Sequence, residues 1–141
     1  LTLDGQGSIY FTDSSTGIVG KIPWTDSGYG STVTLGSVSE PIGVQLDAQG
    51  NLYIAEDGGT GVVEVPRAGS GYGSPVTLLT NNETNAVALD ASGNLYFAYS
   101  TASGVNLAYK LDLATKVTVV KSRSSPGSSS SGRRASSSVS K

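Results

Sequence analysis

The chain has 141 residues, a formal net charge of −2 and neither Cys nor His, and its length suits one ordinary domain. Without Cys there is no disulfide framework and no thiolate metal site, and without His the commonest general base and metal ligand are missing. All 11 acidic residues lie in residues 1–120, whereas residues 121–141 carry five of the nine basic residues and no acid. An acidic body without a basic stripe argues against nucleic-acid binding, and no apolar run approaches the ~20 residues of a membrane span.

The beginning of the chain bears on its origin. The first residue is Leu rather than Met, and Leu1-Thr2-Leu3 is typical of an interrupted strand, so we expect a processed piece of a longer protein. No signal peptide is recognisable, and any secretion signal would lie outside these residues.

The most informative feature is a phrase that occurs three times at equal steps. LDGQGSIYFTD begins at Leu3, LDAQGNLYIAED at Leu46 and LDASGNLYFAY at Leu89, so each step is 43 residues. A second phrase, SGYGSTVTL, begins at Ser27 and returns as SGYGSPVTL at Ser70, again 43 residues later. A fixed period of this size predicts an array of supersecondary units built on one plan.

Each unit is expected to contain four short strands, because β-branched and aromatic residues recur in short runs between turn residues. In the first unit, residues 1–40, strands are expected at 1–3, 8–12, 18–22 and 32–35. In the second, residues 41–83, they are expected at 42–46, 51–55, 62–65 and 76–79. In the third, residues 84–120, they are expected at 85–89, 94–98, 105–111 and 117–120. Helical periodicity is absent, so the sequence predicts an all-β fold.

An Asp-x-x-Gly motif joins the first and second strand of every unit. Its ends are the pairs Asp4 and Gly7, Asp47 and Gly50, and Asp90 and Gly93. An Asp side chain accepts backbone N–H groups of its own turn, and Gly supplies a positive φ at the turn exit. We therefore interpret these six residues as turn formers rather than ligands.

Aromatic residues mark the connection between the third and fourth strands. Trp24, Tyr29 and Tyr72 lie in or beside the Gly-Tyr-Gly loops of the first two units, whereas the third unit has the different and shorter connection LAYKLDLATK. Exposed aromatic rings at such loops could stack on a carbohydrate or on another protein. They could equally pack against the next unit.

Three acids follow the second strands, at Asp13, Glu56 and Asp57. Paired carboxylates could bind Ca²⁺, which takes about 6–8 oxygen ligands, and these residues are the candidate metal site. The third unit has Tyr99 in place of Glu56, so no ring of acids forms. We expect the three acids to cap turns and face water, and we expect no cofactor.

Two further features lie towards the end of the chain. Asn82 opens an Asn-Glu-Thr sequon, which is a candidate glycosylation site. Residues 121–141 contain 11 Ser among 21 residues and almost nothing apolar. Such a stretch cannot bury enough surface to offset its ordering entropy, so we expect a disordered tail.

The repeat resembles a known family. Four antiparallel strands in about 40–45 residues is the period of a β-propeller blade. The pattern PIGVQLDAQGNLYIAED followed by GVVEV resembles the NHL repeat, and the VPRAGSGYGS and IPWTDSGYGS loops resemble those of large secreted bacterial proteins of that family. The resemblance covers residues 1–120 and implies a β-propeller-type array of three four-stranded antiparallel blades in an extracellular protein.

Three blades are too few for a closed propeller, which holds four to eight. An open arc exposes apolar flanks and unpaired strand edges that favour association. The chain is therefore either part of a longer propeller, whose remaining blades complete it, or half of a six-bladed ring formed with a second copy. Open head-to-tail stacking would instead produce a fibre.

The composition leaves little for catalysis, because neither a Ser-His-Asp nor a Cys-His arrangement can be built. The NHL-like lyases and lactonases that the chain resembles in fold use His or a central metal site, and nothing here matches either. We expect a non-catalytic extracellular module for binding, scaffolding or assembly, with a protein partner or a carbohydrate. The alternatives are a self-assembling fibre subunit and a fragment of a propeller lyase or hydrolase.

Overall fold

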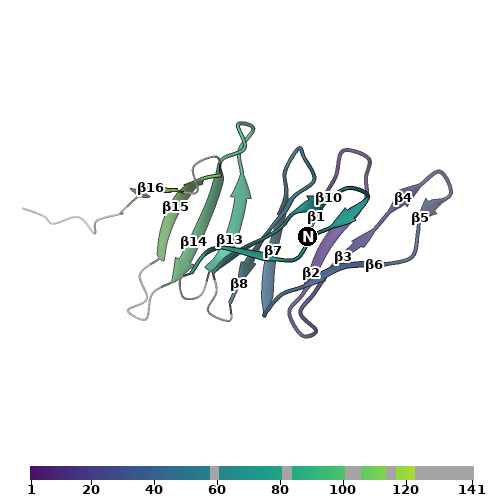
Figure 1. The fold of residues 1–141 in the computed structure, drawn as a ribbon, viewed down its shortest axis with the longest axis horizontal. Helices are drawn as coiled ribbons and strands as arrows, with labels where there is room; N and C mark the ends of the chain where they lie inside the picture. Colours follow the sequence, from purple (N-terminus) through teal and green to yellow (C-terminus); the bar gives the residue numbers. More distant parts are fainter. Residues whose placement is uncertain (58–60, 81–83, 101–105, 114–116, 123–141) are drawn as a thin grey trace, which may run out of the picture.

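The computed structural model describes residues 1–57, 61–80, 84–100, 106–113 and 117–122, and every regular element in these ranges is a β-strand (Figure 1). The predicted all-β class is therefore confirmed. In the same ranges we find no helix of the length and apolarity that a membrane crossing would need.

Twelve strands form three sheets of four, one for each repeat unit. The first sheet contains β1 (Thr2–Leu3), β2 (Ile9–Asp13), β3 (Ile18–Ile22) and β6 (Val33–Ser37). The second contains β7 (Pro41–Leu46), β8 (Leu52–Glu56), β9 (Val62–Val65) and β12 (Val76–Leu79). The third contains β13 (Thr84–Leu89), β14 (Leu95–Ser100), β15 (Asn106–Asp112) and β16 (Val117–Ser122). All neighbours are antiparallel, and the first strand pair keeps one register in every unit, with the pairs Leu3 and Ile9, Leu46 and Leu52, and Leu89 and Leu95.

Two short ribbons lie where the sequence predicts only loops. They pair β4 (Trp24–Thr25) with β5 (Gly28–Tyr29), and β10 (Arg67–Ala68) with β11 (Gly71–Tyr72). The first residue of each ribbon is tied to the first residue after an Asp-x-x-Gly turn. The N–H of Trp24 donates to Ser8 Oγ at 3.1 Å, and that of Arg67 to Asn51 Oδ1 at 2.9 Å. Strands of two residues are too short to show a periodic pattern, so the sequence does not reveal them.

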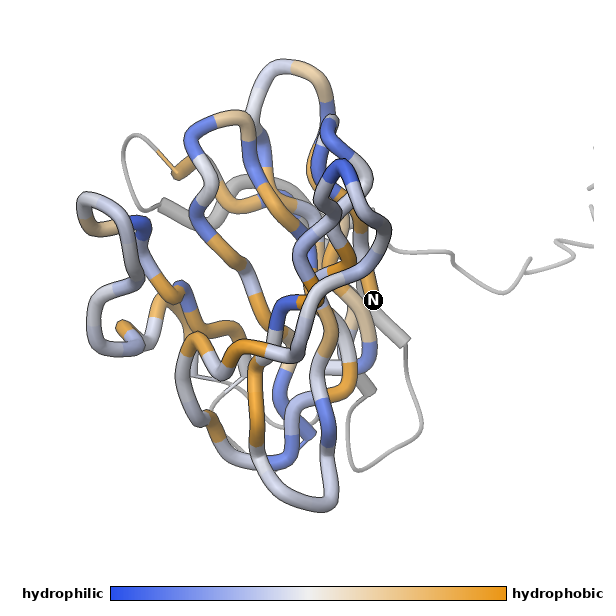
Figure 2. Tube along the Cα trace, turned by 90° about the vertical axis from the view of Figure 1, so that its right-hand side faces the viewer, coloured by the Kyte–Doolittle hydropathy of each residue, from blue (hydrophilic) through white to orange (hydrophobic). Residues whose placement is uncertain are grey.

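The three sheets stack in a row, as Figure 1 shows. Between the first and second sheets lies a core of Tyr10, Val19, Val44, Leu52, Ile54 and Val65. Between the second and third sheets lies a core of Tyr53, Ala55, Val62, Val87, Leu95, Phe97 and Leu111. Figure 2 shows hydrophobic segments mainly along the strands and hydrophilic segments mainly at the turns.

The second sheet is buried on both faces. Successive residues of a strand point to opposite faces, so on β8 Leu52 and Ile54 pack towards the first sheet while Tyr53 and Ala55 pack towards the third. This explains why β8 is a continuous apolar run up to Glu56 rather than an alternating pattern. Fully burying each such aliphatic side chain contributes roughly 1.5–3 kcal/mol.

The stack is open within the described ranges, because the three sheets follow one another and do not close into a ring. β16 extends to Ser122 and so includes the first two residues of the expected tail. The remaining residues of the predicted tail, 123–141, lie outside the described residues.

Candidate functional site

One aspartate holds each turn between the first and second strand of a sheet. Asp47 Oδ1 accepts the N–H groups of Gln49 and Asn51 at 2.9 and 2.8 Å. Its Oδ2 accepts the Asn51 side-chain amide at 2.8 Å and the Tyr53 hydroxyl at 3.1 Å. Asp90 makes the same four bonds one repeat later, with Ser92, Asn94 and Tyr96.

The first turn varies this arrangement. Asp4 Oδ1 accepts the N–H groups of Gln6 and Ser8 at 3.0 and 2.8 Å, and its Oδ2 lies 3.6 Å from Lys21 Nζ. Burial raises the pKa of Asp4, but the N–H groups of Ser8 and Gln6 outweigh burial and bring it below its ordinary value. The side chain and N–H of Asn94 act on Asp90 in the same sense and lower its pKa to about 2.

The glycines of the three turns have the conformation that the motif demands. Gly7, Gly50 and Gly93 have φ values of 92°, 89° and 77°, a region that other L-residues rarely adopt. Oδ1 of every turn aspartate thus binds N–H groups of the turn itself, and Oδ2 binds side chains of the same sheet. The six motif residues therefore have a structural role.

Two grooves run between neighbouring turns. The smaller, of about 360 Å³, lies between the first and second sheets, and the larger, of about 790 Å³, between the second and third. Lys21 and Arg67 line the smaller groove, whereas the larger groove has only acidic charged residues among those described, namely Asp47, Glu64 and Asp90. The two grooves therefore lie at equivalent places in the repeat and differ in size and in charge.

Aromatic rings and cations pack together in the smaller groove. Lys21 Nζ lies 4.9 Å from the centre of the Tyr10 ring, and Arg67 Cζ lies 5.2 Å from that of Tyr72. Tyr72 packs against the core cluster that contains Tyr10, and burial raises the pKa of Tyr72 to about 12. Tyr72 thus packs against the first sheet and offers no open platform to a ligand.

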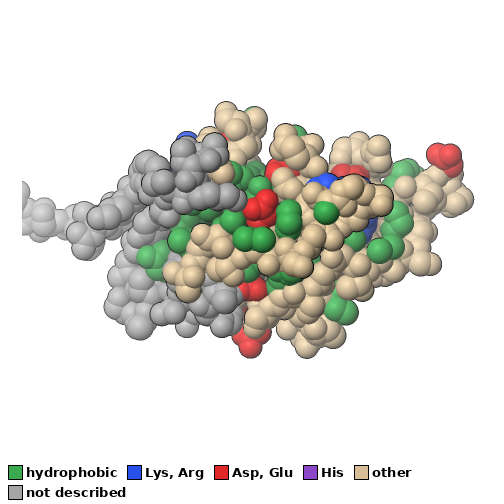
Figure 3. All heavy atoms as spheres, viewed as in Figure 1, with side chains coloured by type: hydrophobic (Ala, Val, Ile, Leu, Met, Phe, Trp, Pro, Cys, Tyr) green, Lys and Arg blue, Asp and Glu red, His purple; other side chains and the backbone are tan. Residues whose placement is uncertain are grey.

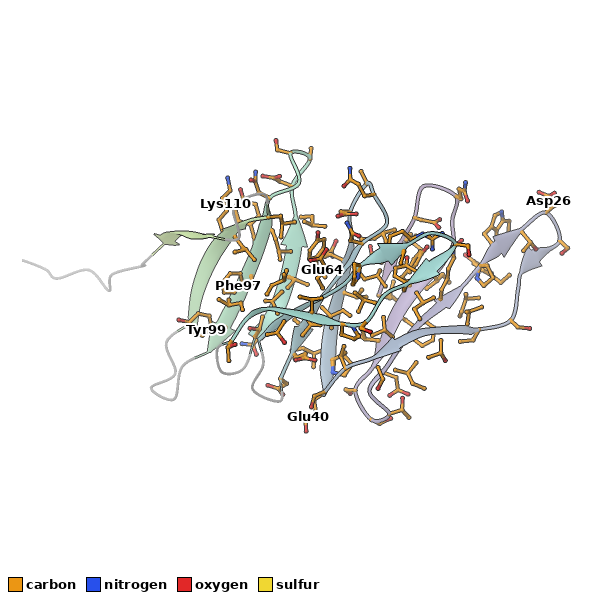
Figure 4. All side chains as sticks on the ribbon, in the orientation of Figure 1. Asp26, Glu40, Glu64, Phe97, Tyr99 and Lys110 are labelled. Carbon is orange, nitrogen blue, oxygen red and sulfur yellow. The ribbon has the colours of Figure 1, made fainter. Side chains whose placement is uncertain are left out.

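Trp24 and Tyr29 occupy the matching positions one repeat earlier, where the described residues include no preceding sheet for them to pack against. Their side chains are 51% and 56% exposed. The rings contact each other edge to face, with centres 4.9 Å apart. They belong to the β4–β5 ribbon, whose tip carries Asp26 away from the sheets in Figure 4.

The three candidate metal ligands have different surroundings. Asp13 Oδ1 accepts the Ser15 hydroxyl and N–H at 2.6 and 2.9 Å, and these bonds, the hydroxyl first, lower its pKa. Asp57 is exposed. The expectation that all three acids face water is wrong for Glu56, which is only 3% exposed because it pairs with the buried start of β7.

Glu56 is the least satisfied polar group of the described structure. Its Oε1 accepts the Ser39 N–H at 3.0 Å, and its Oε2 is buried without a hydrogen-bond partner. Burial raises the pKa of Glu56, and the Ser39 N–H offsets only part of that rise.

The acids do not assemble into a metal site. No group of three or more Asp and Glu side chains suited to a metal ion occurs among the described residues, and Figure 3 shows acidic side chains at separate places on this face. The candidate glycosylation site, Asn82, lies outside the described residues.

The outer faces of the terminal sheets are the remaining candidate surface. Tyr10, Tyr53 and Tyr96 occupy one repeat position, yet their exposed fractions are 5%, 3% and 40%. At the other end of the stack, Leu1 and Leu3 are 80% and 57% exposed. The sequence predicts open apolar flanks without naming their residues, although counting in steps of 43 from any buried residue would have identified them.

No protein-family model matches the chain, and no curated protein does.

Proposed function

We propose that the chain is a non-catalytic extracellular module for binding and scaffolding, built from propeller-like blades, whose two terminal sheets are completed by a neighbouring β-sheet. The observation that carries this is the contrast between Tyr53, buried against the third sheet, and Tyr96, which is 40% exposed at the same repeat position. Exposed apolar surface that matches an internal interface favours a partner of the same kind.

The other parts of this function have separate support. The blade-like arrangement is supported by three equal four-stranded sheets at a constant spacing, and the extracellular location by the resemblance of the Gly-Tyr-Gly loops to secreted bacterial NHL proteins. A non-catalytic role is favoured by a chain without His or Cys, because these residues supply most nucleophile–base pairs. Further blades of a longer chain and a second copy are both suitable partners.

Cysteine labelling can test whether the terminal faces are covered, because the natural chain contains no Cys. We would introduce Ala88→Cys, at an exposed position on the outer side of β13, and express the variant in the source organism. In material purified gently from that source, the thiol should react with a maleimide at least about tenfold more slowly than in the isolated chain at high dilution.

Ser27→Cys, in the exposed turn between β4 and β5, is the matched control and should react equally fast in both samples. Equal labelling rates for Ala88→Cys in the two samples would show that the face is uncovered, and the proposed function would then be wrong.

A further inference from the structure

The two internal interfaces of the stack are built on one plan. The second sheet presents Val44, Leu52 and Ile54 to the first sheet, and the third presents Val87, Leu95 and Phe97 to the second. These two sets are the same positions, 43 residues apart. In return, the earlier sheet presents Tyr10 at one interface and Tyr53 at the other. Each interface thus joins a face rich in Val, Leu and Ile, here called the aliphatic face although it includes Phe97 in the third sheet, to a tyrosine face of the sheet before it.

The outer face of the first sheet is an aliphatic face with no sheet before it. Stepping back 43 residues from Val44, Leu52, Ile54 and Val65 leads to Leu1, Ile9, Phe11 and Ile22. The register places Ile9, Phe11 and Ile22 on the face opposite Tyr10, because Ile9 pairs with Ile22 while Tyr10 pairs with Lys21. All of these outer-face residues are partly or largely exposed.

The outer face of the third sheet is a tyrosine face with no sheet after it. Tyr96 and Ala98 stand where Tyr53 and Ala55 stand in the second sheet. Val87, Leu95 and Phe97 point towards the second sheet, as Figure 4 shows for Phe97, so their neighbours Ala88, Tyr96 and Ala98 point outwards. An apolar hollow of about 150 Å³ lies beside these residues.

We infer that the outer face of the first sheet in one chain binds the outer face of the third sheet in a second copy, head to tail. One chain carries both halves of an interface that it already uses twice. A dimer whose two-fold axis passes through a single pair of faces would instead set like faces against each other, aliphatic on aliphatic or tyrosine on tyrosine, and neither combination occurs in the stack. This contact presupposes the proposed function and names the partner that the terminal sheets take.

The same contact accounts for the exposed ribbon. Trp24 and Tyr29 correspond to Arg67 and Tyr72, and Tyr72 reaches back to cover Tyr10 of the preceding sheet. In the head-to-tail contact, Tyr29 would cover Tyr96 of the other copy, and Trp24 would lie near Lys110, the cross-strand neighbour of Tyr96. Lys110 next to an aromatic ring would repeat the cation–π pairs of the smaller groove.

Cross-linking between two single-cysteine variants of the 141-residue chain tests the direction of the contact. Leu3→Cys and Ala88→Cys mark the two faces, and their counterparts Leu89 and Gln45 line the same groove of the internal interface. When the two variants are mixed with a short bis-maleimide, the mixed dimer should form several-fold faster than either homodimer. If a homodimer of either variant forms as fast as the mixed dimer, or if no cross-link forms at all, the inference is overturned.

Light scattering of the unlabelled chain provides the second readout. The wild-type chain should self-associate, either as a closed pair or as a growing filament. Leu3→Lys or Tyr96→Lys alone should weaken association roughly tenfold or more, as expected for central interface residues. Val76→Lys is the control, because Val76 is 49% exposed on the edge strand β12 of the middle sheet. A monomer at every concentration would overturn the inference.

The two tests separate two kinds of failure. If Ala88→Cys is protected in native material while no mixed dimer forms, the terminal faces are covered by other blades and only the second copy is wrong. If Ala88→Cys is unprotected, the proposed function fails as well.

Discussion

The second sheet and the terminal sheets carry nearly the same sequence and have different environments. In the second sheet, the whole of β8 is buried, because each face has a neighbour. In the first sheet, the matching strand β2 is buried at Tyr10 and partly exposed at Ile9 and Phe11. The comparison shows that a repeat position is core or surface according to its neighbour, as expected for an array stabilised by nearest-neighbour interfaces.

The largest expected effect comes from truncating one repeat position in all three sheets. Leu52→Ala and Leu95→Ala each remove a side chain that is 0% exposed, and each should lower the free energy of unfolding by about 2–5 kcal/mol. Ile9→Ala, at the partly exposed equivalent, should cost clearly less in a dilute sample. Urea unfolding monitored by circular dichroism measures all three variants.

Concentration is the control for this comparison. If a second copy covers the first sheet, the cost of Ile9→Ala should rise towards that of Leu52→Ala as the protein concentration is raised. Equal costs for the three variants in dilute solution would contradict the view that the terminal faces are open.

The first and second sheets also differ in one cross-strand pair, in which one partner is larger and the other smaller in the first sheet than in the second. The second sheet pairs Ile54 with Val63, whereas the first pairs Phe11 with Gly20. A Cβ on Gly20 would clash with the Phe11 ring at Cζ. Gly20→Val should therefore cost roughly 1–3 kcal/mol, because the ring must move from the strand it covers.

The double variant Phe11→Ile with Gly20→Val recreates the pair of the second sheet and provides the control. It should recover most of the lost stability in the same urea measurement, and the two substitutions should be strongly non-additive. Additive costs would mean that Phe11 and Gly20 do not constrain each other.

Much of the fold could be predicted from the sequence because its signals are local. Turn residues such as Asp47 and Gly50 define the hairpins, and the constant 43-residue step aligns the strands of one sheet with those of the next. The fourth strand of the first unit, expected at 32–35, instead forms at Val33–Ser37, a shift within the usual uncertainty of strand ends.

What could not be predicted depends on contacts between units. A carboxylate at a strand end is usually exposed, and nothing local to Glu56 shows that the loop at Ser39 folds over it. Similarly, Tyr29 and Tyr72 occupy identical SGYGS contexts, and only the presence of a preceding sheet separates the exposed ring from the partly buried one.

The smallest predicted effect is a difference in how stability depends on pH at the two acids that end the second strands, Glu56 and Asp13. The pKa of Glu56 is raised by burial and that of Asp13 is lowered by its bonds to Ser15. The folded protein therefore holds the Glu56 proton more tightly than the unfolded chain does, and the resulting stability is complete below the ordinary Glu pKa. It is lost as the pH rises through the raised value. The contribution of Asp13 has the opposite sign and is lost as the pH falls through its lowered pKa.

Replacing each acid by its amide should separate the two signs. Glu56→Gln removes the buried charge, so at pH 7 the variant should exceed the wild-type stability by up to about 1 kcal/mol. This value is the lower end of the cost of an unpaired buried group, because the Ser39 N–H already satisfies one oxygen. The gain should vanish near pH 4, where Glu56 is protonated. Asp13→Asn should instead be less stable than the wild type at pH 7 and approach it at low pH. Thermal melts between pH 3 and 8 measure the stability of both variants against the wild type. A stability difference between Glu56→Gln and the wild type that is constant over this range would show that Glu56 keeps its ordinary pKa and that water reaches Oε2 behind the loop at Ser39.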